Sequence, residues 1–268
     1  MTNFPLLKLP AVALHEVMKM MMPNEIYFRE NHKSMILKHV NLNEIVDIQR
    51  RLLAIFRFPF MGWTLYRLDY DHFQLLRKVL NTEYTQLAFI GDSLSESMLR
   101  DVLDKVPATR ELEILSDIPL TFNHPSAFKC FKTNFDDARW MKLQNLFSIR
   151  NVDTVTLERT NFDCSDINKF LRYWVDCDEF MLRTLVIGFK KGTVVFGNEA
   201  VITDQLTTVS YKDNCYPLIF MKSKRDAGQK YILGRLELQE TSVVFTTWDP
   251  NEEFSDKFQI LIEKERNV

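Results

Sequence analysis

The chain has 268 residues, of which 46% are hydrophobic and 26% are charged, and it contains 7 Gly and 9 Pro. These fractions are typical of a globular protein with one large or two small domains, and they exclude a disordered or collagen-like chain. The net charge of -2 at pH 7 gives no electrostatic reason to expect nucleic acid or an anionic membrane as a partner.

The N-terminal stretch "FPLLKLPAVALHEVMKMMMPNEI", residues 4–26, is rich in apolar side chains. Lys8, His15, Glu16 and Lys19 interrupt it, so it matches neither a membrane span, which needs about 20 nearly uncharged residues, nor a signal peptide. We therefore expect a cytoplasmic or nuclear protein without a membrane partner.

A short helix is predicted within this stretch. Apolar residues recur at the spacing of one helical face at Leu14, Val17, Met18 and Met21. Pro10 suits the first turn of such a helix and Pro23 ends it. A helix of about three turns is not stable alone in water, so it must pack against its own domain or against another protein.

Residues 41–71 form a predicted connector with one helix, a turn and a short strand. Beyond it, strands predicted at 85–91, 111–117, 128–135, 152–160 and 182–189 alternate with helices predicted at 72–80, 95–103, 140–149 and 165–175. One strand every 20 to 30 residues is the spacing of leucine-rich repeats, which stack into a curved parallel sheet. An open α/β sheet with crossover helices is the alternative.

The last part of the chain is β-rich without intervening helices. Four such runs occupy 205–213, 215–224, 229–238 and 241–249. We expect them to form an antiparallel cap on the last repeat. The predicted fold class is therefore α/β: a short N-terminal helical region, then an irregular leucine-rich-repeat-like β/α domain with a C-terminal antiparallel β cap.

Two parts of the sequence resemble a known family. Residues 4–26, with a Leu-Pro pair before an apolar helix and then Pro, an acidic residue and Ile, resemble the start of an F-box. Further on, Asn168, Phe170, Leu171 and Trp174 match the pattern "N-x-F-L-x-x-W", and "IFMKSKRDAGQKYILGRLEL" resembles a hairpin of the same family. Over about 4–40 and 80–250 the chain is similar to nematode (Caenorhabditis-type) F-box proteins with a type 2 F-box-associated domain.

The resemblance implies a domain plan and a function. It implies an F-box-like region at 4–40, a connector at 41–71 and an F-box-associated repeat-like α/β domain at 72–262. The expected function is that of a non-catalytic substrate-recognition subunit of an SCF-type ubiquitin ligase. The F-box would bind a Skp-type adaptor, and through it a cullin, while the other domain would bind an unidentified protein target. The implied adaptor-binding residues are Leu9, Pro10, Val17, Met21, Pro23 and Ile26.

Two alternatives stay open. The polar residues 29–32, "RENH", depart from the F-box pattern, so the chain could instead be a stand-alone protein-interaction module that binds or neutralises a partner without the ligase. The stretch "GDSLS", residues 91–95, resembles the nucleophile block of some esterases. That block needs a histidine late in the chain, and none follows His124, which leaves a hydrolase as a remote alternative.

The remaining reactive residue types have structural interpretations. The four cysteines, Cys130, Cys164, Cys177 and Cys215, form no C-x-x-C pair and are interpreted as reduced, buried thiols. Asp69, Asp71 and His72 lie on alternating faces, so Asp71 is interpreted as a helix N-cap. Trp140 and Trp174 are expected in the core. No metal site and no cofactor are predicted.

Overall fold

The computed structural model describes residue 50, residues 62–66, residue 77 and residues 79–193, 195–212, 217–223 and 232–248. The chain divides into two compact units, Met1–Ala88 and Phe89–Val268. The predicted F-box-like region and all of its adaptor-binding residues lie outside the described residues.

The described part of the first unit contains strand β1 (Gly62–Tyr66), which confirms the short strand predicted after the turn. Trp63 of this strand donates a hydrogen bond from Nε1 to the Thr82 hydroxyl at 3.0 Å. Thr82 in turn donates its hydroxyl hydrogen to the Val79 carbonyl at 2.8 Å. Two side-chain hydrogen bonds thus tie β1 to the turn that follows residue 80.

The second unit holds most of the described secondary structure. Its strands are β2 (Gln86–Ser93, which begins in the first unit), β3 (Glu111–Asp117), β4 (Lys132–Phe135), β5 (Val152–Leu157), β6 (Leu182–Gly188), β7 (Thr208–Lys212), β8 (Pro217–Lys222), β9 (Leu233–Leu238) and β10 (Ser242–Trp248). Its helices are α4 (Glu96–Lys105), α5 (Leu143–Phe147), α6 (Cys164–Asp176) and α7 (Glu199–Ile202).

These strands form one mixed sheet. Their order in the second unit is β2-β3-β4-β5-β6-β10-β9-β8-β7. The pairs β3-β4, β4-β5 and β5-β6 are parallel. The pairs β6-β10, β10-β9, β9-β8 and β8-β7 are antiparallel. The last described strand therefore returns to the middle of the sheet and joins a parallel half to an antiparallel half.

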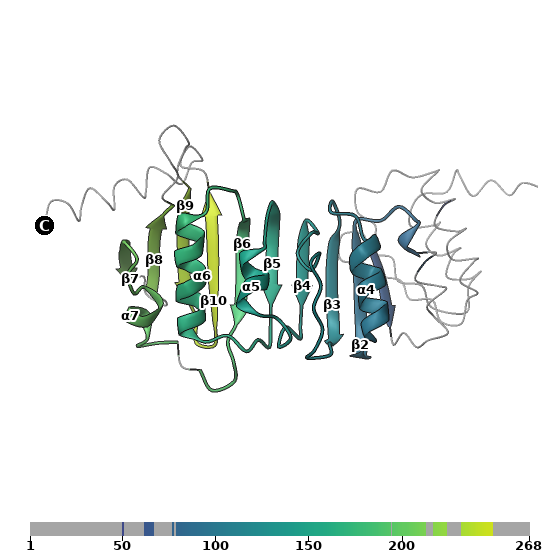
Figure 1. The fold of residues 1–268 in the computed structure, drawn as a ribbon, viewed down its shortest axis with the longest axis horizontal. Coiled ribbons are helices and arrows are strands. Elements are labelled where there is room, and N and C mark those ends of the chain that lie inside the picture. Colours follow the sequence, from purple (N-terminus) through teal and green to yellow (C-terminus); the bar gives the residue numbers. More distant parts are fainter. Residues whose placement is uncertain are drawn as a thin grey trace, which may run out of the picture. The chain divides into compact units, whose positions relative to one another are not determined.

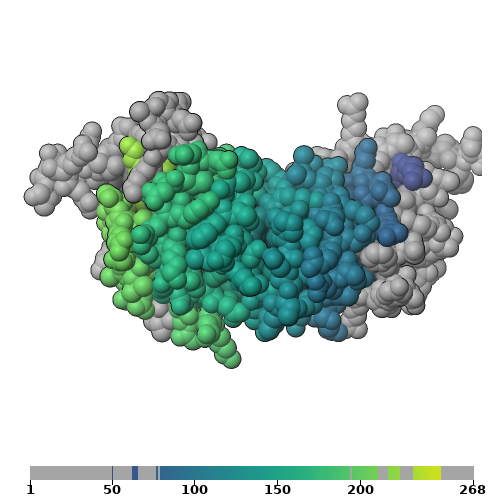
Figure 2. Space-filling model, in the orientation of Figure 1, coloured from purple at the N-terminus to yellow at the C-terminus, as the bar shows by residue number. Residues whose placement is uncertain are grey.

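The sheet is covered by helices on one face. Figure 1 shows α4, α5 and α6 on the same side of the strands. In the same view, Figure 2 shows that the atoms of the teal and green segments cover this side of the sheet. Residues that are paired across neighbouring strands form rows, and the side chains in the rows that face the helices are buried. One such row contains Leu112, Val155, Leu185 and Phe245. Alternation with period 2 places the remaining side chains on the opposite face.

Helix α6 packs on strands β9 and β10 of the antiparallel half. Asp163 begins it as the N-cap and accepts a hydrogen bond from the Asp166 amide at 3.0 Å. Trp174 meets Phe245 of β10 edge-to-face, with ring centroids 4.9 Å apart. A Cβ on Gly234 of β9 would lie only 2.8 Å from the Phe245 ring and 2.9 Å from Trp174. The residue at 234 must therefore be glycine for this aromatic pair to reach the sheet.

The "N-x-F-L-x-x-W" pattern is a packing pattern in this fold. Phe170, Leu171 and Trp174 are at most 3% exposed on the inner side of α6. Asn168 is also buried, and its Nδ2 donates to the carbonyls of Ile202 at 2.9 Å and Asp204 at 2.8 Å. These two bonds hold the end of α7, whose carbonyls would otherwise lack partners.

The predicted fold class is wrong in its architecture. The antiparallel strands do not cap a repeat array, because β10 pairs directly with β6 and extends the same sheet. The β/α repeat also fails, because no helix lies in the described connection from β3 to β4 and α5 has only five residues. Strand spacing alone cannot separate a repeat array from this sheet, since both place consecutive parallel strands side by side.

Individual elements were predicted more accurately than their assembly. The prediction for β3 matches at both ends, and β5, β6 and α6 are present with small shifts. The prediction for β4 was too long, since 128–131 form turns before Lys132. The helix α7 was missed. Burial of Trp140 and Trp174 is confirmed.

We predict that Gly234→Ala lowers the free energy of unfolding by about 1–3 kcal/mol, since the added methyl group overpacks the Trp174–Phe245 contact. Urea denaturation would measure this change. Glu237→Ala, on the opposite face of the same strand, is the control and should change stability by no more than about 0.5 kcal/mol. Equal effects of the two substitutions would contradict the packing role of Gly234.

Candidate functional site

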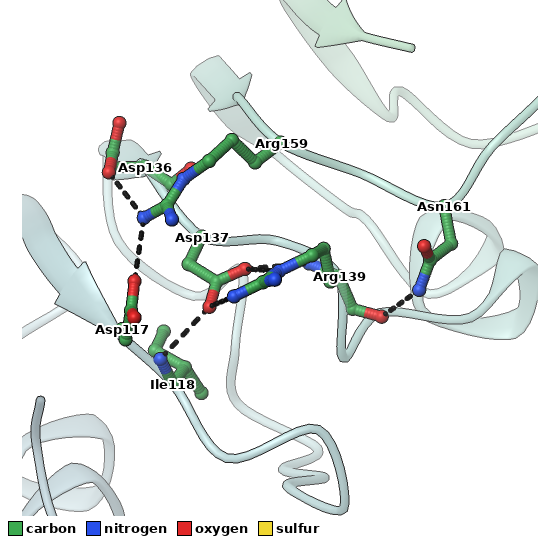
Figure 3. Close-up of polar contacts among 7 residues, drawn as sticks. All are labelled: Asp117, Ile118, Asp136, Asp137, Arg139, Arg159 and Asn161. Carbon is green, nitrogen blue, oxygen red and sulfur yellow. Dashed lines mark hydrogen bonds and ion pairs between the residues drawn. The ribbon is translucent and has the colours of Figure 1, made fainter. Parts of the chain in front are cut away.

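A group of charged side chains lies where three parallel strands end. Asp117 is the last residue of β3, Asp136 and Asp137 follow β4, and Arg159 follows β5. Ligands in α/β sheets commonly bind beyond the carboxyl ends of the strands, which makes this edge the first candidate site. Figure 3 shows its side chains converging from the three loops.

Arg159 bridges two carboxylates on neighbouring strands. Its Nη2 lies 2.9 Å from Asp117 Oδ1 and 2.6 Å from Asp136 Oδ2. Its Nε also donates to the Asp136 carbonyl at 3.1 Å. Burial opposes the charged guanidinium, but the hydrogen bonds to Asp117 and Asp136 outweigh it and raise the pKa of Arg159. One side chain thus links the ends of β3, β4 and β5.

Asp137 is the buried member of this group, with no exposed surface. Its Oδ1 accepts from Arg139 Nε at 2.7 Å and its Oδ2 accepts from Arg139 Nη2 at 2.8 Å. Its carboxylate also accepts from the backbone amides of Ile118 at 3.2 Å and Arg139 at 3.3 Å. Burial raises the pKa of Asp137, but these hydrogen bonds outweigh it, so its pKa is lowered and the group stays ionised.

The network continues across the edge to the loop after β5. Asn161 Nδ2 donates to the Arg139 carbonyl at 2.7 Å, and the Thr160 hydroxyl donates to the Gly188 carbonyl at 2.6 Å at the end of β6. The carboxylates and guanidinium groups of this edge are therefore paired with each other. The arrangement is a brace between consecutive loops, in which each of these charged side chains has a partner within the chain.

A second polar cluster surrounds His124, in the connection between β3 and β4. Its Nδ1 accepts from the Ser126 amide at 3.2 Å, which leaves the proton on Nε2, 3.2 Å from Asp104 Oδ1 of α4. Burial lowers the pKa of His124 below 6.5, with help from Arg100 and Lys129 and against the opposing charge of Asp104. The neutral imidazole therefore fastens this long connection to α4.

The sheet face opposite the helices carries two rows of mostly polar side chains. Two register rows cross it, and all of their residues are half-buried: Glu111, Lys132, Thr154, Thr184, Thr246 and Arg235 in one row, and Glu113, Asn134, Thr156, Val186, Val244 and Glu237 in the other. We call these twelve residues the open face. None of the described helices lies over it in Figure 1.

The chemistry of the open face is polar and nearly neutral. Glu111 and Lys132 form an ion pair at 3.0 Å at one end. Threonines occupy its centre, and Arg235 and Glu237 lie at the other end on β9. The hydroxyl groups at the centre of the open face and the charged groups at its two ends can form hydrogen bonds with a polypeptide. The nearly neutral net charge of this face gives little electrostatic attraction to a charged partner.

The other candidate residues from the sequence have structural roles wherever the structure describes them. In "GDSLS", Ser93 ends β2 and Ser95 is the N-cap of α4, accepting from the Met98 amide at 3.3 Å. Cys130, Cys164 and Cys177 are free thiols, and burial raises the pKa of Cys130 to about 11. Cys215, Asp69, Asp71 and His72 lie outside the described residues.

The described part of the chain contains neither a metal-binding cluster nor a membrane-spanning helix. Among the described residues, no three His, Cys, Asp or Glu side chains are grouped so that they could hold a metal ion. No described helix has both the length and the apolar character that crossing a membrane requires.

Comparison with known sequences identifies one weak relative. No family model matches the chain. The Caenorhabditis elegans protein named Skn-1 dependent zygotic transcript 15 protein is 25% identical over 130 residues. The match covers 46% of this chain and only 38% of the relative, so the chain spans well under two thirds of that protein. The chain is thus similar to a nematode protein, and neither an F-box nor a type 2 F-box-associated domain is shown.

Three of the solved structures that the chain matches are bacterial proteins. An S-adenosylmethionine-dependent methyltransferase from Clostridium acetobutylicum has 9% identity and a TM-score of 0.19, over 84% of this chain and 80% of that one. CalS10, an amino pentose methyltransferase from Micromonospora echinaspora, has 12% identity and a TM-score of 0.18, over 83% and 84%. Streptomyces venezuelae DesVI has 12% identity and a TM-score of 0.17, over 82% and 81%.

These structures correct one expectation. The sequence led us to expect a chain without catalysis, whereas the solved structures that it matches include methyltransferases, which are enzymes. We therefore withdraw the expectation of a non-catalytic chain. TM-scores of 0.17 to 0.19 assign no reaction and no cofactor to the chain.

We predict that Asp137→Ala lowers the free energy of unfolding by about 1–3 kcal/mol, because it leaves the buried Ile118 amide without its acceptor. The neighbouring Asp136→Ala removes only a half-exposed ion pair and should cost no more than about 1 kcal/mol. Chemical denaturation at pH 7 measures both. A larger loss from Asp136→Ala would show that the brace depends on Arg159 rather than on the buried carboxylate.

We also predict a pH-dependent contribution from His124. Because its folded pKa lies below the unfolded value of about 6.5, the unfolded state binds more protons as the solution is acidified. The stability that the neutral His124 contributes is fully present above a pH of about 6.5. It is lost as the pH falls from there through the pKa of His124 in the folded state. The difference in stability between wild type and His124→Gln, measured from pH 7.5 to 4.5, should shrink over this window. A difference that does not change with pH would overturn this account.

Proposed function

We propose that the chain is the substrate-recognition subunit of an SCF-type ubiquitin ligase, which holds a protein target on the open face of its sheet. The open face is the observation that supports target binding. Its twelve side chains come from six adjacent strands and are half-buried, on the side of the sheet that the described helices leave free. Residues fixed by a sheet lose little entropy when a partner binds, which favours recognition.

Adaptor binding is supported by the resemblance of residues 4–40 to an F-box. In this proposal, Leu9, Pro10, Val17, Met21, Pro23 and Ile26 contact a Skp-type adaptor, and through it a cullin. The open face then keeps the target near the ubiquitin-charged enzyme, which raises the effective concentration of its lysines.

A stand-alone binding module is the second candidate. The polar residues 29–32, which replace apolar residues of the F-box pattern, favour it. In this case the open face binds its target in the same way, and the target is neutralised by occupancy without being ubiquitylated.

We predict that purified chain captures recombinant Skp-type adaptor at micromolar concentration, and that Leu9→Ala/Pro10→Ala abolishes the capture by removing apolar contacts. A pull-down with increasing adaptor measures this. Lys8→Ala, adjacent to the altered pair, is the control and should retain binding. Absence of adaptor binding by the wild type would contradict the ligase proposal and favour the stand-alone module.

The target-binding face is tested in cells of the source organism with Thr154→Arg/Thr184→Arg. Both threonines are paired across β5 and β6 in the centre of the open face. We first identify the proteins whose ubiquitylation falls when the chain is deleted. In cells that carry the double variant instead of the wild type, the ubiquitylation of these proteins should fall by the same amount. Gln144→Arg, on the exposed side of α5, is the control for added charge and should leave ubiquitylation unchanged.

A further inference from the structure

Among the described residues, one cation of the open face has no partner. Arg235 of β9 is half-buried, and its Nε is shielded from solvent without a hydrogen-bond partner. It forms no ion pair with any residue that the structure describes, whereas Lys132 at the other end of the same row is paired with Glu111 at 3.0 Å. An unpaired, half-buried guanidinium is costly, because burial removes water without supplying another acceptor.

The surroundings of Arg235 strengthen its attraction for an anion. Its partners in register are Phe220 of β8 on one side and Thr246 of β10 on the other. Phe220 is 9% exposed and packs in an apolar cluster with Leu233 and Trp248, so apolar side chains border Arg235 on that side. Charges attract more strongly where less water screens them. On the other side, Thr246 offers a hydroxyl group that can donate to the same anion.

The far end of the open face carries the opposite chemistry. Asn134 of β4 is half-buried, and its Oδ1 is shielded from solvent without a hydrogen-bond partner. Glu113 of β3 pairs with Asn134 in register and adds a carboxylate beside it. Acceptors therefore gather at β3 and β4, and an unpaired donor lies at β9. A complementary partner has a cation at the first end and an anion at the second.

We propose that Arg235 binds the carboxylate of an Asp or Glu side chain in an extended segment of the target, and that a Lys or Arg about six residues away in that segment meets Asn134 and Glu113. This inference rests on the proposed binding of a target by the open face. Four strand spacings, or about 19 Å, separate β9 from β4, and an extended chain covers that distance in about six residues. Arginine suits the acidic residue because its planar group can bind both oxygens of a carboxylate.

The centre of the open face has a different part in this recognition. Between the two charged ends, the segment crosses the row of Thr246, Thr184 and Thr154, which are neighbours on β10, β6 and β5. Their hydroxyl groups can donate to the backbone of the segment or accept from it, whatever its sequence. The ends therefore select the target, and the threonines add affinity that does not depend on its side chains.

Selection of peptides on the immobilised full chain tests the charge requirement. The probe is a phage library of random peptides of about 12 residues, which is twice the expected spacing. Peptides enriched by the wild type should carry Asp or Glu with Lys or Arg about six positions away. Arg235→Gln should lose the preference for an acidic residue, and Arg235→Glu should change it to a preference for a basic one. Arg172→Glu, exposed on α6, is the control and should select the same peptides as the wild type.

A charge exchange with one synthetic peptide tests the contact itself. Arg235→Glu should weaken binding of the best enriched peptide at least about tenfold. Replacing the acidic residue of that peptide by Arg should restore most of the affinity for Arg235→Glu and not for the wild type. Because an unfolded variant would bind neither peptide, this recovery also shows that the variant is folded. Equal loss for both peptides, or an unchanged acidic preference in Arg235→Glu, would overturn the inference.

The double variant Thr154→Arg/Thr184→Arg separates this inference from the proposed function. If it abolishes peptide binding while the Arg235 variants keep the acidic preference, the open face remains the target site and only the role of Arg235 is overturned. If the double variant binds the peptides as the wild type does, the open face itself is overturned as the target site. Failure of the wild type to enrich any peptide would overturn this inference, whereas capture of the adaptor would still support the ligase proposal.

Discussion

The pairing of β10 with β6 is the constraint on which the rest of the second unit depends. It inserts the last described strand beside the last parallel strand, so that nine strands share one pleat and one direction of twist. The parallel half therefore needs no separate cap, because β10 covers the edge that β6 would otherwise expose. The contact of Trp174 with Phe245 completes the junction from the helical side, and it is possible only because residue 234 has no Cβ.

This junction also makes the two faces of the sheet unequal. The described helices gather on one face, where large side chains fill the core. The other face keeps alternate residues of six strands half-buried, and ten of these twelve residues are polar or charged, which lets them remain in contact with water. A surface of this kind is fixed by backbone hydrogen bonds rather than by loops, which makes it suitable for recognition without rearrangement.

The charged edge and the open face have different roles. At the carboxyl ends of β3, β4 and β5, Arg159 is paired with both Asp117 and Asp136, and Asp137 is enclosed by Arg139 and the Ile118 amide. Such pairing consumes the groups that could bind a ligand and instead fixes the loops. On the open face, the central threonines keep hydroxyl groups at a half-buried surface, so that face is the better candidate for binding.

Much of the local structure of the second unit follows from patterns in the sequence. Period-2 alternation located β3 at both ends, and the apolar spacing of residues 165–175 located α6, because burial on one face leaves a periodic pattern in the chain. The brace was not predictable, since Arg159 meets Asp117 only when β3, β4 and β5 lie side by side. That the β-rich end joins the parallel strands at β6 is seen only in the folded chain, because strand pairing is a long-range choice of partner that alternation within one strand does not encode.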